Sequence, residues 1–262
     1  MSPLHTPRTR DQYLNEDERI LYDYFVKTLC FGDDLHSRLS FEFLIEVRNF
    51  AKGKTVLDAG AGHKRFEPFF KNSNYLSLEH HSGIDMKNME GISYDFVCEL
   101  DGDDFAVDGG SVDAIYNHSV LEHIAKPEKF FQNAFNALKE GGRLFIHCPF
   151  TYVEHEAPFD YNRFTRYGLR KRLEDAGFCI VKLMPSSNAA YGATSFVLNA
   201  IEHECTARGI TLEGVTFPDG DVVPLVPLLT LMLNYVNKMT DDAIYDSAFP
   251  IGWICVAEKN VK

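Results

Sequence analysis

The chain has 262 residues, enough for one large domain or two small ones, and its 45% apolar content is typical of a soluble globular protein. Its formal net charge of −12 argues against a nucleic-acid partner, because phosphate binding needs an excess of Lys and Arg. Its six cysteines include no closely spaced pair, which argues against a disulfide framework or zinc site and favours a cytoplasmic location.

Two helices are predicted before the first strand, within residues 11–51. Apolar residues recur there at helical spacing, for example at Leu21, Phe25 and Leu29. We expect these helices to form an N-terminal helical cap over residues 1–50 and to lie over the open end of the following sheet.

The most informative stretch is Val56-Leu57-Asp58-Ala59-Gly60-Ala61-Gly62, a short apolar run that ends in a carboxylate and a glycine-paired turn. Two glycines let the backbone turn sharply and approach a ligand closely. A dinucleotide-binding loop needs a third glycine, at the position where this chain has Arg65. The carboxylate of Asp58 would also repel a pyrophosphate. This order of groups favours a cationic ligand without phosphate, such as S-adenosylmethionine.

Strands and helices then alternate, which predicts an α/β fold with helices on both faces of the sheet. This fold class is a Rossmann-like, seven-stranded and mostly parallel sheet. The strands are expected at Thr55–Asp58, Tyr75–Leu78, Phe96–Cys98, Ala114–Tyr116, Arg143–Cys148, Cys179–Met184 and Trp253–Ala257. One helix is expected to start at Pro127 and stop at Gly141-Gly142, and another to run from Arg166 to Ala176.

About 65 residues separate the last two expected strands, although a short hairpin would connect them. Helical patches at Ala193–Cys205 and Leu225–Met239 predict a helical lid or insert over residues 186–248. The core would then span 51–185, with its final strand in 249–262. The apolar run in the insert favours a buried or partner-facing helix over a membrane span, because prolines interrupt it. A homodimer through the insert is consistent with this prediction.

Three stretches of the middle region resemble class I S-adenosylmethionine-dependent methyltransferases. Residues 111–124 are similar to their fourth strand and the loop after it, and residues 138–144 resemble the turn before their fifth strand. Residues 155–165, His-Glu-Ala-Pro-Phe-Asp-Tyr-Asn-Arg-Phe-Thr, are similar to an H-x-x-P-x-D-Y-x-R-[FY]-T signature of a small-molecule subgroup. The resemblance implies S-adenosylmethionine as the cofactor and a last strand that inserts antiparallel.

The resemblance also implies a set of cofactor-binding residues at the carboxyl ends of the strands. The glycine turn would hold the methionine end, and Glu79 would accept both ribose hydroxyls, with Asp85 as a rival. Glu99 and Leu100 would lie beside the adenine. The full set is Asp58, Gly60, Ala61, Gly62, Glu79, Glu99, Leu100, Asn117, His118 and Ser119, of which the last three would lie under the sulfonium.

Candidate catalytic residues lie in the loops after the fourth and fifth strands. His155 is the leading candidate for a general base, because it follows the fifth strand and histidine exchanges a proton near neutral pH. Asp160 and His123 are further candidates. Tyr152, Tyr161 and Arg163 are predicted to bind substrate, although an Asp–Arg pair and a tyrosine are also common braces of a long loop. A metal site of His155, Glu156 and Asp160 is conceivable, but the sequence favours none.

The resemblance predicts an S-adenosylmethionine-dependent methyltransferase that acts on a small polar metabolite. A sugar, a glycan precursor or a natural-product scaffold is the expected acceptor, with O-methylation by in-line displacement. Amine and carboxylate acceptors stay open. Two alternatives remain: an isomerase, cyclase or lyase that uses the same cofactor, and a non-catalytic protein that binds it.

Overall fold

The structure, a computed structural model, describes residues 14–29, 35–80, 91–207, 215–216, 222–223, 231, 235 and 248–260. Its helices are α1 (Glu16–Leu29), α2 (Leu35–Ala51), η1 (Glu67–Phe70), η3 (Leu121–His123), α3 (Pro127–Ala137), α4 (Arg166–Asp175) and α5 (Ala189–Ala207). Its strands are β1 (Thr55–Ala59), β2 (Asn74–Glu79), β3 (Phe96–Val97), β4 (Val112–His118), β5 (Leu138–Pro149), β6 (Phe178–Pro185), β7 (Val215–Thr216), β8 (Val222–Val223) and β9 (Gly252–Lys259).

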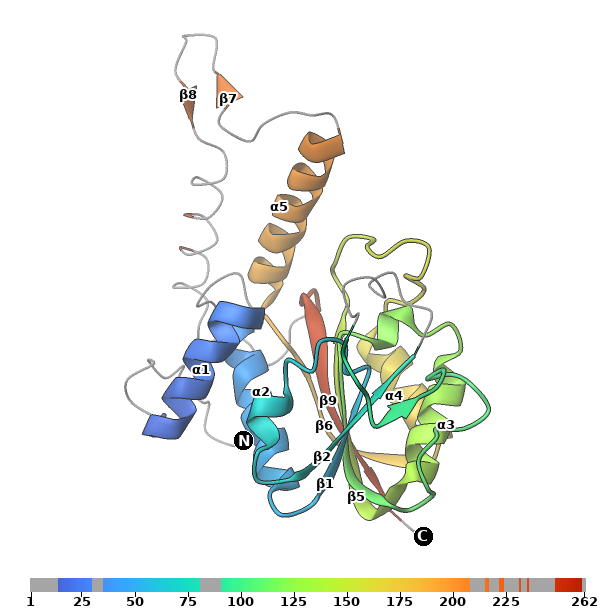
Figure 1. The fold of residues 1–262 in the computed structure, drawn as a ribbon. Helices are drawn as coiled ribbons and strands as arrows, with labels where there is room; N and C mark the ends of the chain where they lie inside the picture. Colours follow the sequence, from blue (N-terminus) through green and yellow to red (C-terminus); the bar gives the residue numbers. More distant parts are fainter. Residues whose placement is uncertain are drawn as a thin grey trace, which may run out of the picture.

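Seven of these strands form one sheet in the order β3-β2-β1-β4-β5-β9-β6. The first five strands along this order are parallel to one another. The last strand, β9, inserts between β5 and β6 and is antiparallel to both (Figure 1). All seven strands predicted from the sequence are confirmed, and so are the fold class and the antiparallel last strand. The carboxyl ends of β1 to β5 therefore meet at one edge, where ligands bind in sheets of this type.

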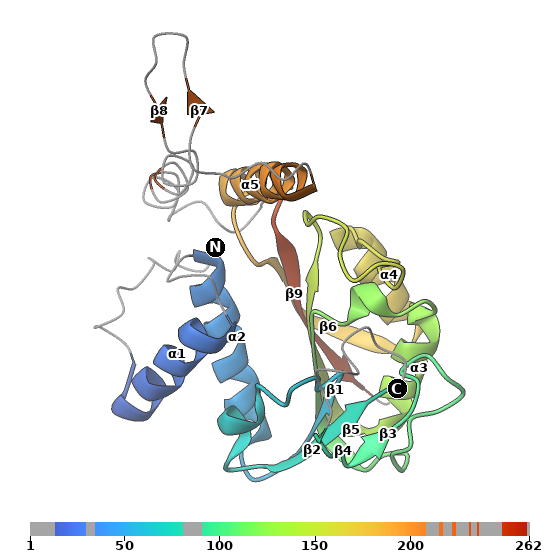
Figure 2. The same cartoon turned by 45° about the horizontal axis from the view of Figure 1, so that its top comes forward.

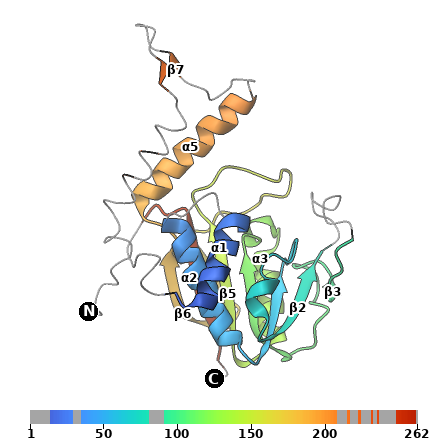
Figure 3. The same cartoon turned by 60° about the vertical axis from the view of Figure 1, so that its left-hand side comes forward.

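Two apolar clusters cover opposite faces of the sheet, because neighbouring strand residues point to opposite sides. On β1, Leu57 belongs to the cluster that includes side chains of α3 and α4. The adjacent Val56 belongs to the cluster that includes side chains of α1, α2 and η1. Figure 3 shows α1 and α2 crossing in front of the sheet, with α3 behind it.

The expectation that the N-terminal helices lie over the open end of the sheet is wrong. Apolar residues of α2, including Phe43 and Val47, pack with strand residues such as Tyr116 and Phe145 in one cluster on a face of the sheet. Their helical spacing makes one continuous apolar stripe, which is best buried along the strands. The start of α2 reaches the carboxyl edge, where His36 Nδ1 lies 3.1 Å from the carbonyl oxygen of Ser186.

The helix that starts at Pro127 ends four residues earlier than predicted. Its last residue is Ala137, and Leu138 is already extended, with φ −71° and ψ 141°. Leu138 pairs with Val112 of β4, so the sheet competes successfully for the residue that would have continued the helix. Gly141, with φ +70°, lies within the long strand β5 instead. The prediction for the following helix is confirmed, since α4 begins at Arg166.

Helix α5 leaves the sheet after β6 and extends beyond the carboxyl edge (Figures 1 and 2). It includes the predicted patch at Ala193–Cys205. The short pair β7 and β8, farther along the chain, is antiparallel. Most of the second predicted patch, Leu225–Met239, lies outside the described residues. Within the described part of the chain, no helix is both long and apolar enough to cross a membrane.

Candidate functional site at the carboxyl edge of the sheet

The glycine turn after β1 brings the backbone close to neighbouring segments. Gly60 has φ +87°, and a Cβ atom on it would lie 2.5 Å from Val120 Cγ2. The backbone N–H groups of Gly60 and Ala61 both donate to the Leu78 carbonyl oxygen, at 2.9 and 3.1 Å. Only glycine fits this position, because the turn needs positive φ and Val120 occupies the space of a side chain. The turn is therefore closely packed against the loop after β4.

Asp58, at the end of β1, is almost fully buried, with 1% of its surface exposed. The Tyr75 hydroxyl donates to Asp58 Oδ2 at 2.7 Å. Burial raises the pKa of this carboxyl from 3.8 to about 7, a rise that the Tyr75 hydrogen bond opposes and the charge of Glu79 increases. The predicted contact between Asp58 and the cofactor's methionine end stays a prediction.

Glu79 ends β2 directly beside the glycine turn. Its Oε2 accepts a hydrogen bond from the Gly62 backbone at 2.7 Å, and its Oε1 accepts one from the His80 backbone at 2.9 Å. The Tyr94 hydroxyl donates to the Gly62 carbonyl oxygen at 2.7 Å, so the turn is fixed from two sides. This brings together two of the residues that were predicted to hold the cofactor. The rival carboxylate, Asp85, lies outside the described residues.

The residues after β3 differ in exposure. Leu100 is buried, with 4% of its surface exposed, and belongs to the apolar cluster that includes α3 and α4. Glu99 has an exposed carboxylate, whose Oε2 lies 3.7 Å from His80 Nδ1. Both residues follow Cys98, whose backbone N–H donates to the Glu79 carbonyl oxygen at 3.0 Å. Their predicted place beside an adenine stays a prediction.

The end of β4 joins the glycine turn to β5. Asn117 is fully buried, and its Nδ2 donates to the Ala59 carbonyl oxygen at 2.8 Å. Its Oδ1 has no hydrogen-bond partner among the described residues. Ser119 has φ +53°, and its backbone N–H donates to the His147 carbonyl oxygen at 2.8 Å. The predicted trio of Asn117, His118 and Ser119 therefore turns the chain at the carboxyl edge.

A cluster of three histidines, which the sequence did not indicate, lies at the same edge. The ring of His118 stacks on His147 with centroids 4.4 Å apart, and His36 follows at 5.2 Å from His147. Burial lowers the pKa of His118 to about 3 and that of His147 well below its usual value, and the neighbouring imidazoles add to this. These two rings are therefore neutral at physiological pH.

The loop after β5 is built around an ion pair. Both oxygens of Asp160 pair with the Arg163 guanidinium, at 2.5 Å from NH1 and 2.7 Å from NH2. Arg163 NH2 also donates to the Val153 carbonyl oxygen at 3.0 Å. Asp160 Oδ2 in turn accepts from the His155 backbone at 2.9 Å and lies 3.2 Å from His155 Nδ1. Asp160 and Arg163 therefore brace the loop and position His155, and the predicted substrate contact of Arg163 stays a prediction.

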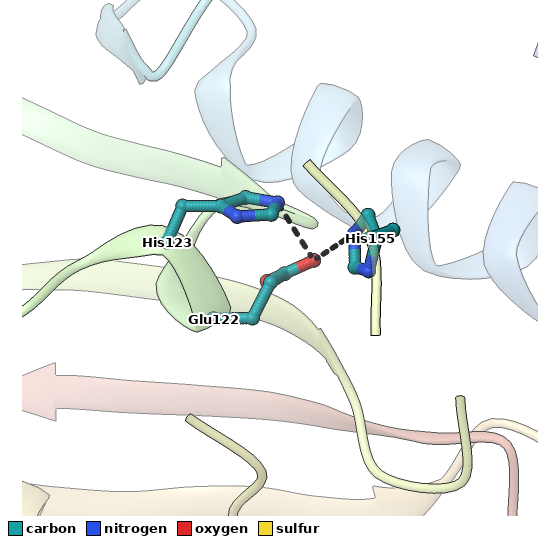
Figure 4. Close-up of side chains that lie close together, drawn as sticks. All are labelled: Glu122, His123 and His155. Carbon is teal, nitrogen blue, oxygen red and sulfur yellow. Dashed lines mark ion pairs between the residues drawn. The ribbon is translucent and has the colours of Figure 1, made fainter. Parts of the chain in front are cut away.

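Glu122, His123 and His155 form a compact group, which we call the Glu122 cluster (Figure 4). Glu122 Oε1 lies 3.8 Å from His123 Nε2 and 3.9 Å from His155 Nε2. The Glu122 side chain is 1% exposed, and burial raises its pKa from 4.5 to about 8. The sequence placed His123 and His155 among the catalytic candidates but did not single out Glu122. The only signal in the sequence was the position of Glu122 directly before His123, in the turn after an apolar strand.

The two tyrosines predicted to bind substrate differ in their surroundings. The Tyr152 ring lies edge-on to His155, with centroids 5.1 Å apart. Tyr161 is 50% exposed, and its backbone N–H donates to the Glu122 carbonyl oxygen at 2.8 Å. Tyr152 therefore borders the cluster, while the side chain of Tyr161 is open to a ligand or to solvent.

The strand order with an antiparallel last strand, and a glycine turn facing an acidic residue on β2, define a Rossmann-like methyltransferase fold. A family model described as a methyltransferase domain matches residues 22–183, more than half of the chain. The chain therefore belongs to the methyltransferase domain family. S-adenosylmethionine, the cofactor predicted from the sequence, is the cofactor of this fold. The match does not single out the subgroup that the 155–165 signature indicates, which stays a prediction.

Solved structures share this fold at low sequence identity. A chain in the complex of the Haloferax volcanii Trm112 methyltransferase activator is similar with a TM-score of 0.53 and 14% identity, over 95% of this chain and 100% of that one. The [4+2]-cyclase SpnF gives 0.50 and 17%, over 86% and 81%. Haemonchus contortus phosphoethanolamine N-methyltransferase 2, in complex with S-adenosyl-L-methionine, gives 0.50 and 15%, over 96% and 59%. A search of curated protein sequences found no significant match.

Proposed function

We propose that the protein transfers a methyl group from S-adenosylmethionine to a hydroxyl group of a small polar metabolite. One observation carries this proposal: the glycine turn after β1 (Gly60 to Gly62), which we call the cofactor turn, lies beside the Glu122 cluster. The Val120 side chain fills the space over Gly60, and Glu122 follows two residues later in the same loop. A cofactor held by the turn and Glu79 would therefore have the cluster as its neighbour.

The charges of the cluster favour a neutral or cationic acceptor over an anionic one. The exposed carboxylate of Glu156 lies next to the cluster, with its Oε2 3.6 Å from His123 Nε2. An acceptor carboxylate or phosphate would meet this group at close range, where like charges repel. A hydroxyl group can instead donate its proton to the cluster.

A bound S-adenosylmethionine supplies an activated methyl group, so the protein has to position the acceptor and take its proton. The acceptor oxygen forms a bond to the methyl carbon while the carbon–sulfur bond breaks, and the electron pair of that bond goes to the sulfur. The hydroxyl proton goes to the cluster, in which His155 Nε2 points toward Glu122. Asp160 acts through His155, by holding its Nδ1 side.

A panel of polyols, sugars and amines tests this proposal by mass spectrometry of the products. We expect an acceptor hydroxyl to gain one methyl group as S-adenosylhomocysteine forms. His155→Ala should lower the rate at saturating acceptor about tenfold or more, as expected for loss of general-base help. The control, His203→Ala, changes an exposed histidine on α5 and should keep the wild-type rate.

Four results would contradict parts of the proposal in different ways. Methylation of amines alone would correct the acceptor class. A product that forms while S-adenosylmethionine stays intact would favour an isomerase, cyclase or lyase. Binding of the cofactor without turnover of any acceptor would favour a non-catalytic role. A rate unchanged in His155→Ala would remove His155 from the reaction.

A further inference from the structure

The Glu122 carboxylate is buried without the hydrogen bonds that such a group needs. Its Oε2 has no hydrogen-bond partner among the described residues, and the side chain is 1% exposed. Its Oε1 faces His123 Nε2 and His155 Nε2 at distances beyond a hydrogen bond. Burial of a carboxylate is costly unless a cation or donors compensate it. A cation bound between the three side chains would compensate an ionised Glu122.

The two imidazole rings are held from their outer sides. His155 Nδ1 lies 3.2 Å from Asp160 Oδ2 and 3.2 Å from the Val153 carbonyl oxygen, both of which are acceptors. His123 Nδ1 lies 3.0 Å from the Phe159 carbonyl oxygen. Arg163 NH2 lies farther from His155 Nδ1, at 3.4 Å, and already donates to Asp160 and Val153. Acceptors at Nδ1 place the ring proton there, which leaves a lone pair on each Nε2.

Three lone-pair atoms therefore converge: two imidazole nitrogens and one carboxylate oxygen (Figure 4). These ligand atoms all lie within 4.8 Å of one another. A tetrahedral ion with bonds of about 2.0–2.1 Å needs about 3.4 Å between its ligands. The two separations from Glu122, 3.8 and 3.9 Å, exceed that by about half an ångström, and the largest separation in the cluster is within 4.8 Å, so side-chain rotations have to bring the three atoms together around an ion.

We propose that Glu122, His123 and His155 bind a divalent transition-metal ion at the carboxyl edge of the sheet. Two imidazoles and one carboxylate are the donor set of catalytic zinc sites and of other first-row metal sites with open positions. Mg²⁺ and Ca²⁺ prefer oxygen ligands, so the two nitrogens disfavour them. Asp160 and the Phe159 carbonyl oxygen supply the outer contacts that orient metal-binding histidines.

Three protein ligands leave at least one coordination position for an acceptor oxygen. This role rests on the proposed function: an acceptor hydroxyl on the ion would lose its proton more readily and would be held near the methyl group. The exposed Glu156 lies next to the cluster, with its Oε2 3.6 Å from His123 Nε2. With an ion bound, His155 would act as a metal ligand in place of the proton acceptor described above, and His155→Ala would still lower the rate.

A metal titration of the chelator-treated protein tests this site without any activity assay. Zn²⁺ is added in a calorimeter, and Co²⁺ is added separately with its visible absorption as the readout of coordination geometry. We expect one equivalent of each ion to bind and Co²⁺ to show the intense bands of a low-coordinate site. Glu122→Gln and His155→Ala should each weaken Zn²⁺ binding about tenfold or more. His203→Ala is the matched control and should bind as the wild type does.

Several outcomes would overturn the metal site. These are no binding of Zn²⁺ or Co²⁺, binding that Glu122→Gln and His155→Ala leave unchanged, or binding that His203→Ala removes. His123→Gln, which keeps a polar side chain of similar size, replaces either variant if it fails to fold by circular dichroism. S-adenosylmethionine binding is measured on the same samples. Cofactor binding without metal binding would refute the metal site alone, and the reverse would refute the proposed function alone.

Discussion

Replacing Asp58 by Asn measures how much the ionisation of this buried carboxyl, at the start of the glycine turn, lowers the free energy of unfolding. Burial is the main cause that raises its pKa from 3.8 to about 7, and Tyr75, Glu79, Lys64 and Glu67 modify that rise. Each pH unit corresponds to about 1.4 kcal/mol, so ionising Asp58 in the folded protein should destabilise it by about 4 kcal/mol. The Asp58→Asn variant avoids this loss and keeps an oxygen for the Tyr75 hydroxyl, which lies 2.7 Å from Asp58 Oδ2.

The sign of the pH dependence follows from where the proton is held more tightly. The pKa of Asp58 is higher in the folded protein than in the unfolded chain, so folding retains this proton between about pH 4 and pH 7. The contribution of Asp58 to stability therefore falls as the pH rises through that window and is constant above it. We expect Asp58→Asn and the wild type to differ little near pH 4, and the variant to be more stable by up to about 4 kcal/mol at pH 8.

Urea unfolding at a series of pH values from 4 to 8 provides the measurement. The single tryptophan, Trp253, is 2% exposed and donates to the Phe164 carbonyl oxygen, so its fluorescence reports unfolding of the core. The difference between the two proteins is the readout, because Glu122, whose pKa burial raises to about 8, acts in both. A difference that stays constant from pH 4 to pH 8 would refute the reasoning.

Two further predictions concern the cofactor turn and its neighbour. Gly60 and Gly53 both have positive φ, but of the two only Gly60 has another side chain where a new Cβ would lie. Urea unfolding should therefore show that Gly60→Ala lowers the free energy of unfolding by about 1–3 kcal/mol more than Gly53→Ala does. An equal loss of unfolding free energy in the two variants would show that the Val120 side chain moves aside without cost. Glu79→Gln should weaken S-adenosylmethionine binding about tenfold or more in calorimetry, as expected when a charged acceptor is lost, whereas the exposed Glu140→Gln should not. Similar affinities in these two variants would remove Glu79 from the cofactor site.

Much of the fold could be predicted because its strands are short apolar runs that end in turns. Such runs identify the strands of the sheet. Because β1 and β2 are parallel, their carboxyl ends lie together, and this places Glu79 beside Gly62. The end of the helix before β5 was not predictable in the same way. The residue that ended it, Leu138, is a good helix former, and its pairing with Val112 depends on contacts distant in sequence.

The candidate site was predictable only where its residues follow a pattern along the chain. His155 and Asp160 are five residues apart in one loop, and the structure joins them as expected. Glu122 lies in a short apolar turn, and nothing in its local sequence shows that its carboxylate is buried between two imidazoles from different loops. The stack of His118 and His147, with His36 beside it, comes from three separate segments, so only the folded chain brings it together.

Calorimetric titration of the wild-type protein with S-adenosylmethionine, run beside a titration with NAD, tests the cofactor assignment most directly. The geometry of the Gly60 turn and Glu79 predicts saturable binding of one S-adenosylmethionine per chain and no binding of the dinucleotide. Absence of heat with S-adenosylmethionine, or saturable binding of NAD in its place, would contradict the methyltransferase assignment of this site.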